Sequence, residues 1–168
     1  MTSIIKVDQI QLADGTAPTA ADLGFAAGSV LNVIQNTTTS GVQMTAVNVW
    51  TDVGPTVTIT PQSTSNKIMV SHHAGIMAYQ STYNQFYRLL RGTTELIQFG
   101  RFYTDLPSSD WQSYTLAFQY LDEPNTTSAI TYKIQAIFDG GTSPQIRHNN
   151  STGSFIPTCM TTAMEIAG

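Results

Sequence analysis

Charge is scarce in this chain of 168 residues, where only 11% are Asp, Glu, Lys or Arg, against about 25% in an average domain. The seven Lys and Arg are scattered singly and the formal net charge is −4. Phosphate recognition needs clustered basic side chains, so we expect no nucleic-acid partner. A surface wetted mainly by hydroxyl and amide groups is poorly protected against self-association. The shortage of charge therefore favours a chain whose surface is covered in an assembly, with a Thr-rich exposed monomer as the alternative.

Cysteine and long apolar runs are also nearly absent. The single cysteine, Cys159, excludes an internal disulfide and says little about the redox compartment. The opening MTSIIKVDQI has no long apolar run, so we expect no secretory signal, no membrane anchor and no membrane insertion. A chain of this length forms one domain, and it buries roughly 70% of its unfolded surface, which is enough for a sizeable core.

Residue patterns typical of catalysis and metal binding are missing as well. The chain has no G-x-S-x-G elbow, no glycine-rich phosphate loop and no HExxH motif. His72 and His73 are adjacent, so on a strand they face opposite sides and cannot chelate one ion together. Asp122 and Glu123 precede Pro-Asn and indicate a turn rather than a pair of catalytic acids. We therefore expect no enzymatic activity, no metal site and no cofactor.

The stretch from Trp111 to Phe138 is the most strongly patterned part of the chain. Two arms with apolar residues at alternate positions are joined by the turn-forming segment 122–128. The alternating residues are Tyr114, Leu116, Phe118 and Tyr120 in the first arm, and Ile130, Tyr132, Ile134, Ala136 and Phe138 in the second. A period of two predicts two β-strands that each present one apolar face. Such a pair of strands buries that face only against a second sheet, which predicts a sandwich.

Strand-like segments follow one another from Ser29 to the end, separated by turn residues. Their spacing predicts roughly eight to ten strands and an all-β fold, an antiparallel β-sandwich of the jelly-roll kind. Residues 28–168 form this domain in our interpretation. Residues 1–27 are too short to bury their own apolar side chains, and we expect an extended N-terminal arm that docks on another protein. The anchoring residues of the arm are Ile5, Val7, Ile10 and Leu12.

Two predicted loops carry side chains that packing does not require. One runs from Tyr103 to Trp111 and the other from Asp139 to Ser154. Binding residues often lie on loops that a rigid scaffold carries, so we expect a contact surface here, which binds a sugar by stacking and hydrogen bonding. The alternative is a pair of solvated turns. The candidate contact residues are Tyr103, Asp105, Trp111, Arg147, His148 and Asn149.

Several longer segments resemble a domain common in tailed bacteriophages of marine and freshwater bacteria, cyanophages among them. They are GSVLNVIQNTTT, VTITPQSTSNKIMV, RLLRGTTEL, YLDEPNTTSAITYKIQ and TAMEIAG, and the opening IIKVDQIQLADGT is similar to the N-terminal arms of these proteins. Such domains are usually labelled tail fibre or virion structural protein. The resemblance implies a β-sandwich, a homotrimer, no enzymatic activity, and a place in the virion after synthesis in the host cytoplasm.

Three functions follow from these observations. The first is a trimeric tail fibre or appendage, anchored by the arm to other virion proteins and touching a glycan or protein of the host surface. The second is a trimeric capsid decoration (cement) protein that clamps the head shell. The third, a glycan hydrolase, lacks an acid pair. The short chain favours decoration, whereas the usual label favours the fibre.

Strands apolar on both faces indicate that the trimer is held by sheet faces, as in the strand with Ile68, Met69, Val70, Ile76 and Met77.

Overall fold

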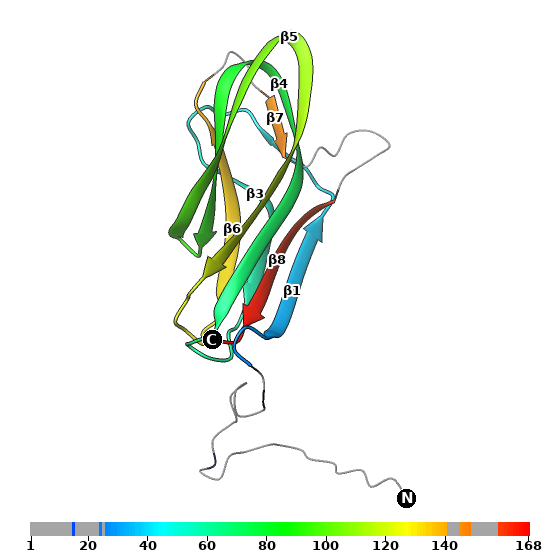
Figure 1. The fold of residues 1–168 in the computed structure, drawn as a ribbon. Helices are drawn as coiled ribbons and strands as arrows, with labels where there is room; N and C mark the ends of the chain where they lie inside the picture. Colours follow the sequence, from blue (N-terminus) through cyan, green and yellow to red (C-terminus); the bar gives the residue numbers. More distant parts are fainter. Residues whose placement is uncertain (1–14, 16–23, 25, 141–144, 149–157) are drawn as a thin grey trace, which may run out of the picture.

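The computed structural model describes residues 15, 24, 26–140, 145–148 and 158–168. Every regular element within these ranges is a β-strand (Figure 1). The strands are β1 (Val30–Thr38), β2 (Val42–Met44), β3 (Thr51–Ile59), β4 (Lys67–Arg91), β5 (Thr94–Asp122), β6 (Ile130–Phe138), β7 (Gln145–His148) and β8 (Cys159–Ile166). None of the described residues belongs to a helix that is long and apolar enough to cross a membrane.

Two antiparallel layers form a sandwich, and both are built on the same long hairpin of β4 and β5. In layer one, the order is β1-β8-β4-β5, where β4 contributes its first half and β5 its last residues. In layer two, the order is β3-β6-β4-β5, where β4 contributes its second half and β5 its first residues. β4 and β5 have 25 and 29 residues, so they run through both layers and turn at Gly92. The predicted all-β, jelly-roll-like sandwich is confirmed.

The two arms between Trp111 and Phe138 bury apolar faces as predicted, but they do not pair with each other. The end of β5 pairs with the start of β4 in layer one, whereas β6 pairs with β3 and with the end of β4 in layer two. The polar segment between them therefore connects the layers. Leu116 points inward from one layer, and Tyr132, Ile134 and Phe138 point inward from the other. Period-two alternation shows which face is buried, but not which strand lies alongside.

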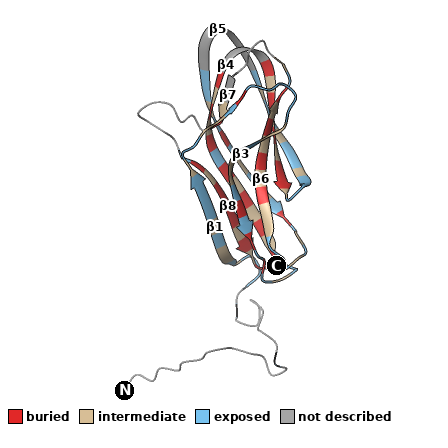
Figure 2. Cartoon of the chain, turned by 180° about the vertical axis from the view of Figure 1, so that it is seen from behind, coloured by how far each residue is buried: buried red, intermediate tan, exposed pale blue. Residues whose placement is uncertain are grey.

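The core lies between the layers and is rich in aromatic side chains. Buried residues recur along β3, β6 and β8, where they are coloured red in Figure 2. On β6 every second residue from Tyr132 to Phe138 is buried, so the alternation in the sequence is the alternation of the pleat. Tyr83, Tyr87, Tyr132 and Phe138 are among the largest side chains that are fully enclosed.

Two buried carboxylates have structural partners. Asp122 was predicted to lie in a turn, but it is the last residue of β5 and only 5% exposed. Arg91 donates to both of its oxygens at 2.9 and 3.0 Å, and the Tyr132 hydroxyl donates at 2.6 Å. Burial, together with the neighbouring Asp122 carboxylate, raises the pKa of Tyr132 well above its ordinary value. Glu165 accepts hydrogen bonds from the Gln62 backbone at 2.6 Å and the Asn66 side chain at 2.7 Å. Both acids are occupied in holding the fold together.

Candidate functional site

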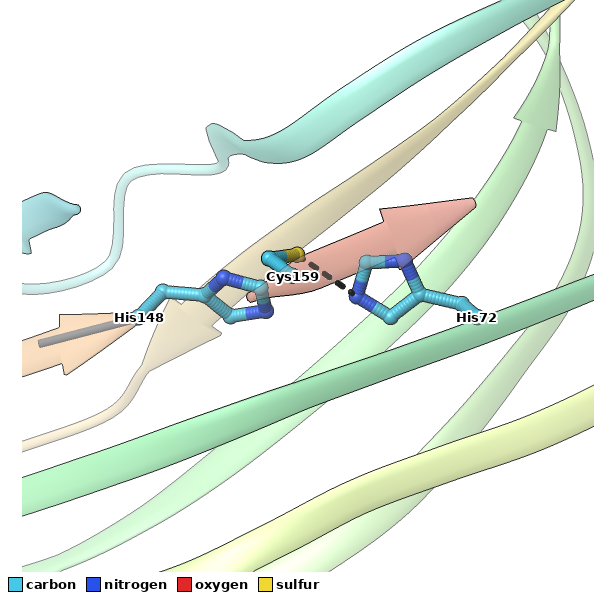
Figure 3. Close-up of side chains that lie close together, drawn as sticks. All are labelled: His72, His148 and Cys159. Carbon is cyan, nitrogen blue, oxygen red and sulfur yellow. Dashed lines mark hydrogen bonds between the residues drawn. The ribbon is translucent and has the colours of Figure 1, made fainter. Parts of the chain in front are cut away.

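Two imidazoles and a thiol meet inside the sandwich. His72 comes from β4, His148 from β7 and Cys159 from β8, and their side chains point toward one another (Figure 3). One donor atom of each lies within 4.8 Å of the donor atoms of the other two. The three residues are 3%, 1% and 0% exposed. This is the largest group of ligating side chains among the described residues. Unlike the exposed contact loops that the sequence predicts, the group is closed to solvent, although His148 belongs to one of those predicted loops.

Strand register explains why these three residues converge. On β4 the residues Val70, His72 and Ala74 alternate inward, while His73 is exposed on the outer face. Thr161 of β8 pairs with His72, so Cys159, two residues earlier, projects to the same side of the layer. β7 lies alongside β4 just beyond the beginning of β8, and His148 pairs with Ile76. All three strands thus deliver their side chains to one region of the core.

A hydrogen-bonded relay fixes the orientation of the His72 ring. The Thr161 hydroxyl donates to the Pro55 carbonyl at 2.7 Å, and its oxygen lies 2.9 Å from Nδ1 of His72. The hydroxyl has one hydrogen, which the carbonyl takes, so Nδ1 of His72 must donate to the hydroxyl. Nε2 then carries the free lone pair. That nitrogen lies 4.0 Å from Sγ of Cys159.

The His148 ring has no such relay. Neither of its nitrogens has a hydrogen-bond partner among the described residues, although the ring is buried. Burial, with the nearby His72 ring 5.4 Å away as a second cause, lowers the pKa of His148 to about 3. Burial also lowers the pKa of His72 to about 4, and it raises the pKa of the Cys159 thiol to about 12. All three groups are therefore neutral near pH 7 in the chain as it stands.

Gly54 of β3 places bare backbone over the cluster from the opposite layer. A Cβ at this position would lie 2.7 Å from Cε1 of His72 and 3.1 Å from Sγ of Cys159. The residue has a φ of 73° and lies at the register shift between Val53 and Val57. Only glycine combines this backbone conformation with the close approach.

The residues predicted to contact a host are dispersed. Tyr103 is 59% exposed on β5. Asp105 and Trp111 are also part of β5, where they pair with Thr82 and Tyr79, so the predicted loop 103–111 is wrong: its backbone continues the β4–β5 hairpin. The sequence between Leu106 and Trp111 is mostly polar and contains Pro107, and the ladder shifts register there, between Tyr79 and Ser81 of β4.

The second predicted loop also contains a strand. Arg147 and His148 belong to β7, which pairs with both β2 and β4. Arg147 is half-buried, and His148 was expected on an exposed loop but is only 1% exposed, so it cannot contact a host. Asn149 and the anchoring residues Ile5, Val7, Ile10 and Leu12 lie outside the described residues.

Sequence reasoning missed the cluster. The observation that His72 and His73 face opposite sides is confirmed, but His72 has other partners. Cys159 is 87 residues from His72, and each of the three donors comes from a different strand. No short spacing motif links them. The signal that was available is weak, namely that His72 and Cys159 sit at apolar positions of their strands.

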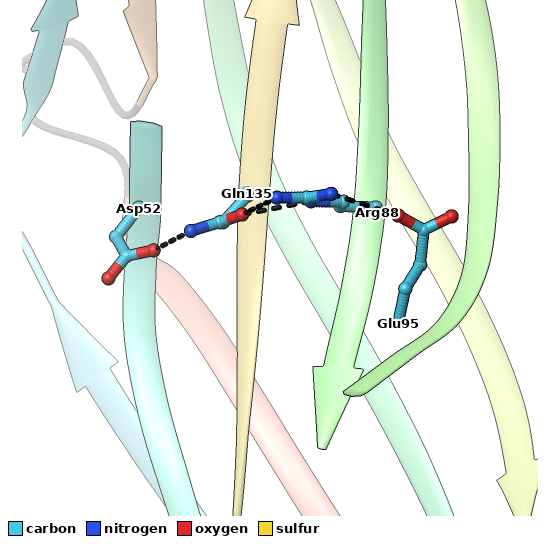
Figure 4. Close-up of polar contacts among 4 residues, drawn as sticks. All are labelled: Asp52, Arg88, Glu95 and Gln135. Carbon is cyan, nitrogen blue, oxygen red and sulfur yellow. Dashed lines mark hydrogen bonds and ion pairs between the residues drawn. The ribbon is translucent and has the colours of Figure 1, made fainter. Parts of the chain in front are cut away.

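A ladder of polar side chains crosses the outer face of layer two. Asp52, Gln135, Arg88 and Glu95 lie in one line over β3, β6, β4 and β5 (Figure 4). Arg88 donates to Gln135 at 2.6 and 2.9 Å and to Glu95 at 2.9 Å, and its guanidinium lies 4.1 Å from the centre of the Trp50 ring. Partial burial would raise the pKa of Asp52, but hydrogen bonds from Gln135 and Lys133 hold it below its ordinary value. This face is solvated and its polar groups are paired.

The outer face of layer one is different, because its central rows carry no charge. One row crosses all four strands and is apolar throughout: Val33, Met164, Met69 and Leu121 pair in that order. Val33 is 52% exposed and Leu121 is 42% exposed. The next rows consist of Gln35, Thr162, Ser71 and Gln119, and of Thr37, Met160, His73 and Ala117. A shallow depression of about 430 Å³ lies here, with Ser71, His73, Gln119 and Met160 in its lining.

Comparisons with known proteins identify no family for this chain. No protein-family model matches it, and no curated protein matches it in sequence. Among solved structures, the infectious bursal disease virus Gx strain matches with a TM-score of 0.44 and 12% identity over 82% of this chain and 32% of the other. The T13 particle of that virus matches with a TM-score of 0.41 and 12% identity, over 83% of this chain and 37% of the other. Its VP2 subviral particle matches with a TM-score of 0.37 and 12% identity, over 82% of this chain and 33% of the other. The chain thus spans about a third of the chains that it matches. No functional conclusion rests on similarities this distant.

Proposed function

We propose that the chain is a non-enzymatic structural protein of a virion, which assembles with further copies of itself through the outer face of layer one. The observation that carries the proposal is the uncharged face with its apolar row from Val33 to Leu121. The sequence resemblance to virion proteins of tailed bacteriophages supports the same conclusion.

The contrast between the two outer faces argues for an interface on layer one. Layer two pairs its polar groups among themselves, in the ladder from Asp52 to Glu95. Layer one offers Met69 and Met164 between the exposed Val33 and Leu121. Among its described residues, charged side chains lie at the margins, where Lys67 forms an ion pair with Glu123 and where Arg147 of β7 pairs with Met77. Interfaces combine an apolar, charge-depleted centre with a polar rim, and methionine is enriched in them. The face on layer one has that composition.

A closed homotrimer is the assembly we propose. Homo-oligomers mostly have closed symmetry, and the resemblance implies threefold symmetry, which would bring the layer-one faces of three chains together around one axis. A trimer fits both a tail fibre or appendage and a capsid decoration protein. We place the tail appendage first, because the resembling domains usually carry that label. Copy number separates the two roles, since an appendage needs tens of chains per virion and a decoration protein needs hundreds.

The oligomeric state tests the interface. Light scattering on the purified full chain at micromolar concentration should give the mass of three chains. The change Leu121→Lys places a charge in the exposed end of the apolar row and should dissociate the oligomer. Gln98→Lys is the matched control, because Gln98 is exposed on the same strand but pairs with Arg88 on layer two. A monomeric parent chain, or an oligomer that Leu121→Lys leaves intact, would refute the proposed interface.

The arm and the host contact need tests of their own. We propose that residues 1–27 anchor the chain to other virion proteins through Ile5, Val7, Ile10 and Leu12. A chain that lacks residues 1–27 should remain folded but be absent from virions. Normal incorporation of the truncated chain would place the anchor elsewhere. For host contact, Tyr103 is a member of the predicted set whose aromatic side chain is exposed on β5. Tyr103→Ala should then reduce adsorption of virions to cells without lowering the melting temperature, and unchanged adsorption would rule out this contact.

A further inference from the structure

We propose that His72, His148 and Cys159 form a binding site for a divalent transition-metal ion of the zinc class, which ties three strands of the sandwich together. The site is independent of the proposed virion role and of the interface on layer one. It rests on the geometry of the three donors, on the unpartnered His148 ring and on the relay that orients His72.

The donor set is one that zinc prefers. Imidazole nitrogen and cysteine sulfur are its usual protein ligands, and sites with three protein ligands leave one position for a solvent molecule. In a tetrahedral site, neighbouring ligand atoms lie about 3.3–3.7 Å apart, as follows from metal–ligand bonds of about 2.0–2.3 Å. The three donors here already lie within 4.8 Å of one another, and Nε2 of His72 is 4.0 Å from Sγ of Cys159. Side-chain movements of about 1 Å are enough to close the site around an ion.

The orientation of His72 is set by groups behind it. Metal-ligating histidines usually donate their other ring N–H to an oxygen, which fixes the tautomer and the ring plane. Nδ1 of His72 donates to the Thr161 hydroxyl, which in turn donates to the Pro55 carbonyl. Nε2 therefore faces Cys159 with its lone pair free. Any buried ring N–H needs an acceptor, so the relay supports the site because it leaves Nε2 free on the side of Cys159.

The His148 ring is the second, independent indication. It is among the largest fully buried side chains, yet neither nitrogen has a partner among the described residues. Buried polar groups are almost always satisfied, so an unsatisfied ring calls for an explanation such as an ion. Its neighbours are the His72 ring at 5.4 Å and the Tyr87 ring at 6.3 Å, measured between ring centres. A metal ion between His148 and the other two donors would give one of its two nitrogens a partner.

A bound ion would have a clear mechanical role. β7 has four residues and is held by its pairing with β2 and β4, while β8 begins at Cys159. A metal coordinated by His148, Cys159 and His72 would join β7 and β8 to the long strand β4 from the inside. The chain has a single cysteine and no disulfide, so a metal is the cross-link its residues can form.

The test measures metal content and coordination in the full chain. Purified protein is freed of metal with EDTA, loaded with Zn²⁺ and desalted, and the metal is quantified by mass spectrometry. We expect one ion per chain. Loading with Co²⁺ instead should give a near-ultraviolet absorption band from thiolate-to-cobalt charge transfer, which reports coordination by Cys159 without any substitution. A parent chain that retains no Zn²⁺, or a Co²⁺ complex without the thiolate band, would overturn the proposal.

Substitutions then identify the ligands. Cys159→Ser and His148→Gln should each abolish retention of the ion on desalting. His73→Gln is the matched control, because His73 is exposed on the other face of β4, and it should bind as the parent does. Thr161→Val removes the relay and should weaken binding about 10–100-fold, as loss of an outer-shell partner usually does. Equal retention by the parent, Cys159→Ser and His148→Gln would show that the ion binds elsewhere.

Discussion

The two buried imidazoles should make the stability of the metal-free chain depend steeply on pH. Burial lowers the pKa of His72 to about 4 and that of His148 to about 3, and both return to about 6.5 when the chain unfolds. At a pH between the folded and the unfolded pKa of each imidazole, the unfolded chain binds more protons than the folded chain, so lowering the pH favours unfolding. The free energy of unfolding is therefore at its full value above pH 6.5 and falls as the pH drops below it.

The size of the effect follows from the same pKa values. At pH 5 both imidazoles are protonated in the unfolded chain and almost entirely neutral in the folded one. Integrating the proton uptake from neutral pH to pH 5 gives a loss of about 2 kcal/mol for each imidazole, or about 4 kcal/mol together. The total stability of a domain is about 5–15 kcal/mol, so this loss is a large share of it.

Urea unfolding between pH 8 and pH 5 in the presence of EDTA measures this loss. The chelator keeps metal off the two histidines. The parent chain should lose about 4 kcal/mol over this range, and His148→Gln should lose about 2 kcal/mol, because only His72 then titrates. His73→Gln should follow the parent, since His73 is exposed. If His148→Gln shows the full loss of the parent, the reasoning from burial is wrong.

Three further changes test contacts at the cluster and elsewhere in the sandwich. Asp122→Ala leaves the Tyr132 hydroxyl and the Arg91 guanidinium without their acceptor, and should lower the free energy of unfolding in urea by about 3 kcal/mol. The control is Lys67→Ala, which breaks an exposed ion pair and should leave the urea midpoint unchanged. Gly54→Ala forces a side chain into a φ of 73° and should cost at least about 1–2 kcal/mol, with a lower melting temperature; an unchanged melting temperature would contradict the close approach. Trp50→Ala removes the ring beneath a guanidinium and should cost about 0.5–1 kcal/mol in the same assay, and no loss would mean that this contact does not stabilise the fold.

The inward faces of the central strands could be predicted from the sequence because they depend on local geometry alone. Alternation from Tyr132 to Phe138 needs no knowledge of the rest of the chain, since successive residues of any strand point to opposite sides. Strand partners are a different matter. The two arms of the stretch 111–138 have equally good apolar faces. The arms lie in opposite layers because β4 and β5 are long enough to run through both layers. Nothing in the alternation distinguishes a hairpin from two strands that face each other across a core.

The cluster of His72, His148 and Cys159 lies beyond prediction for a related reason. Helical and hairpin metal sites leave short spacings in the sequence, because their ligands come from one element or from two that are joined by a turn. Here each donor comes from a separate strand, and the pairing of β7 and β8 with the two ends of one long stretch of β4 brings them together. A histidine at an apolar position is consistent with a satisfied core residue as well as with a ligand. Only the register of three strands shows that the three donor atoms converge, so such a cluster becomes visible after the fold and not before it.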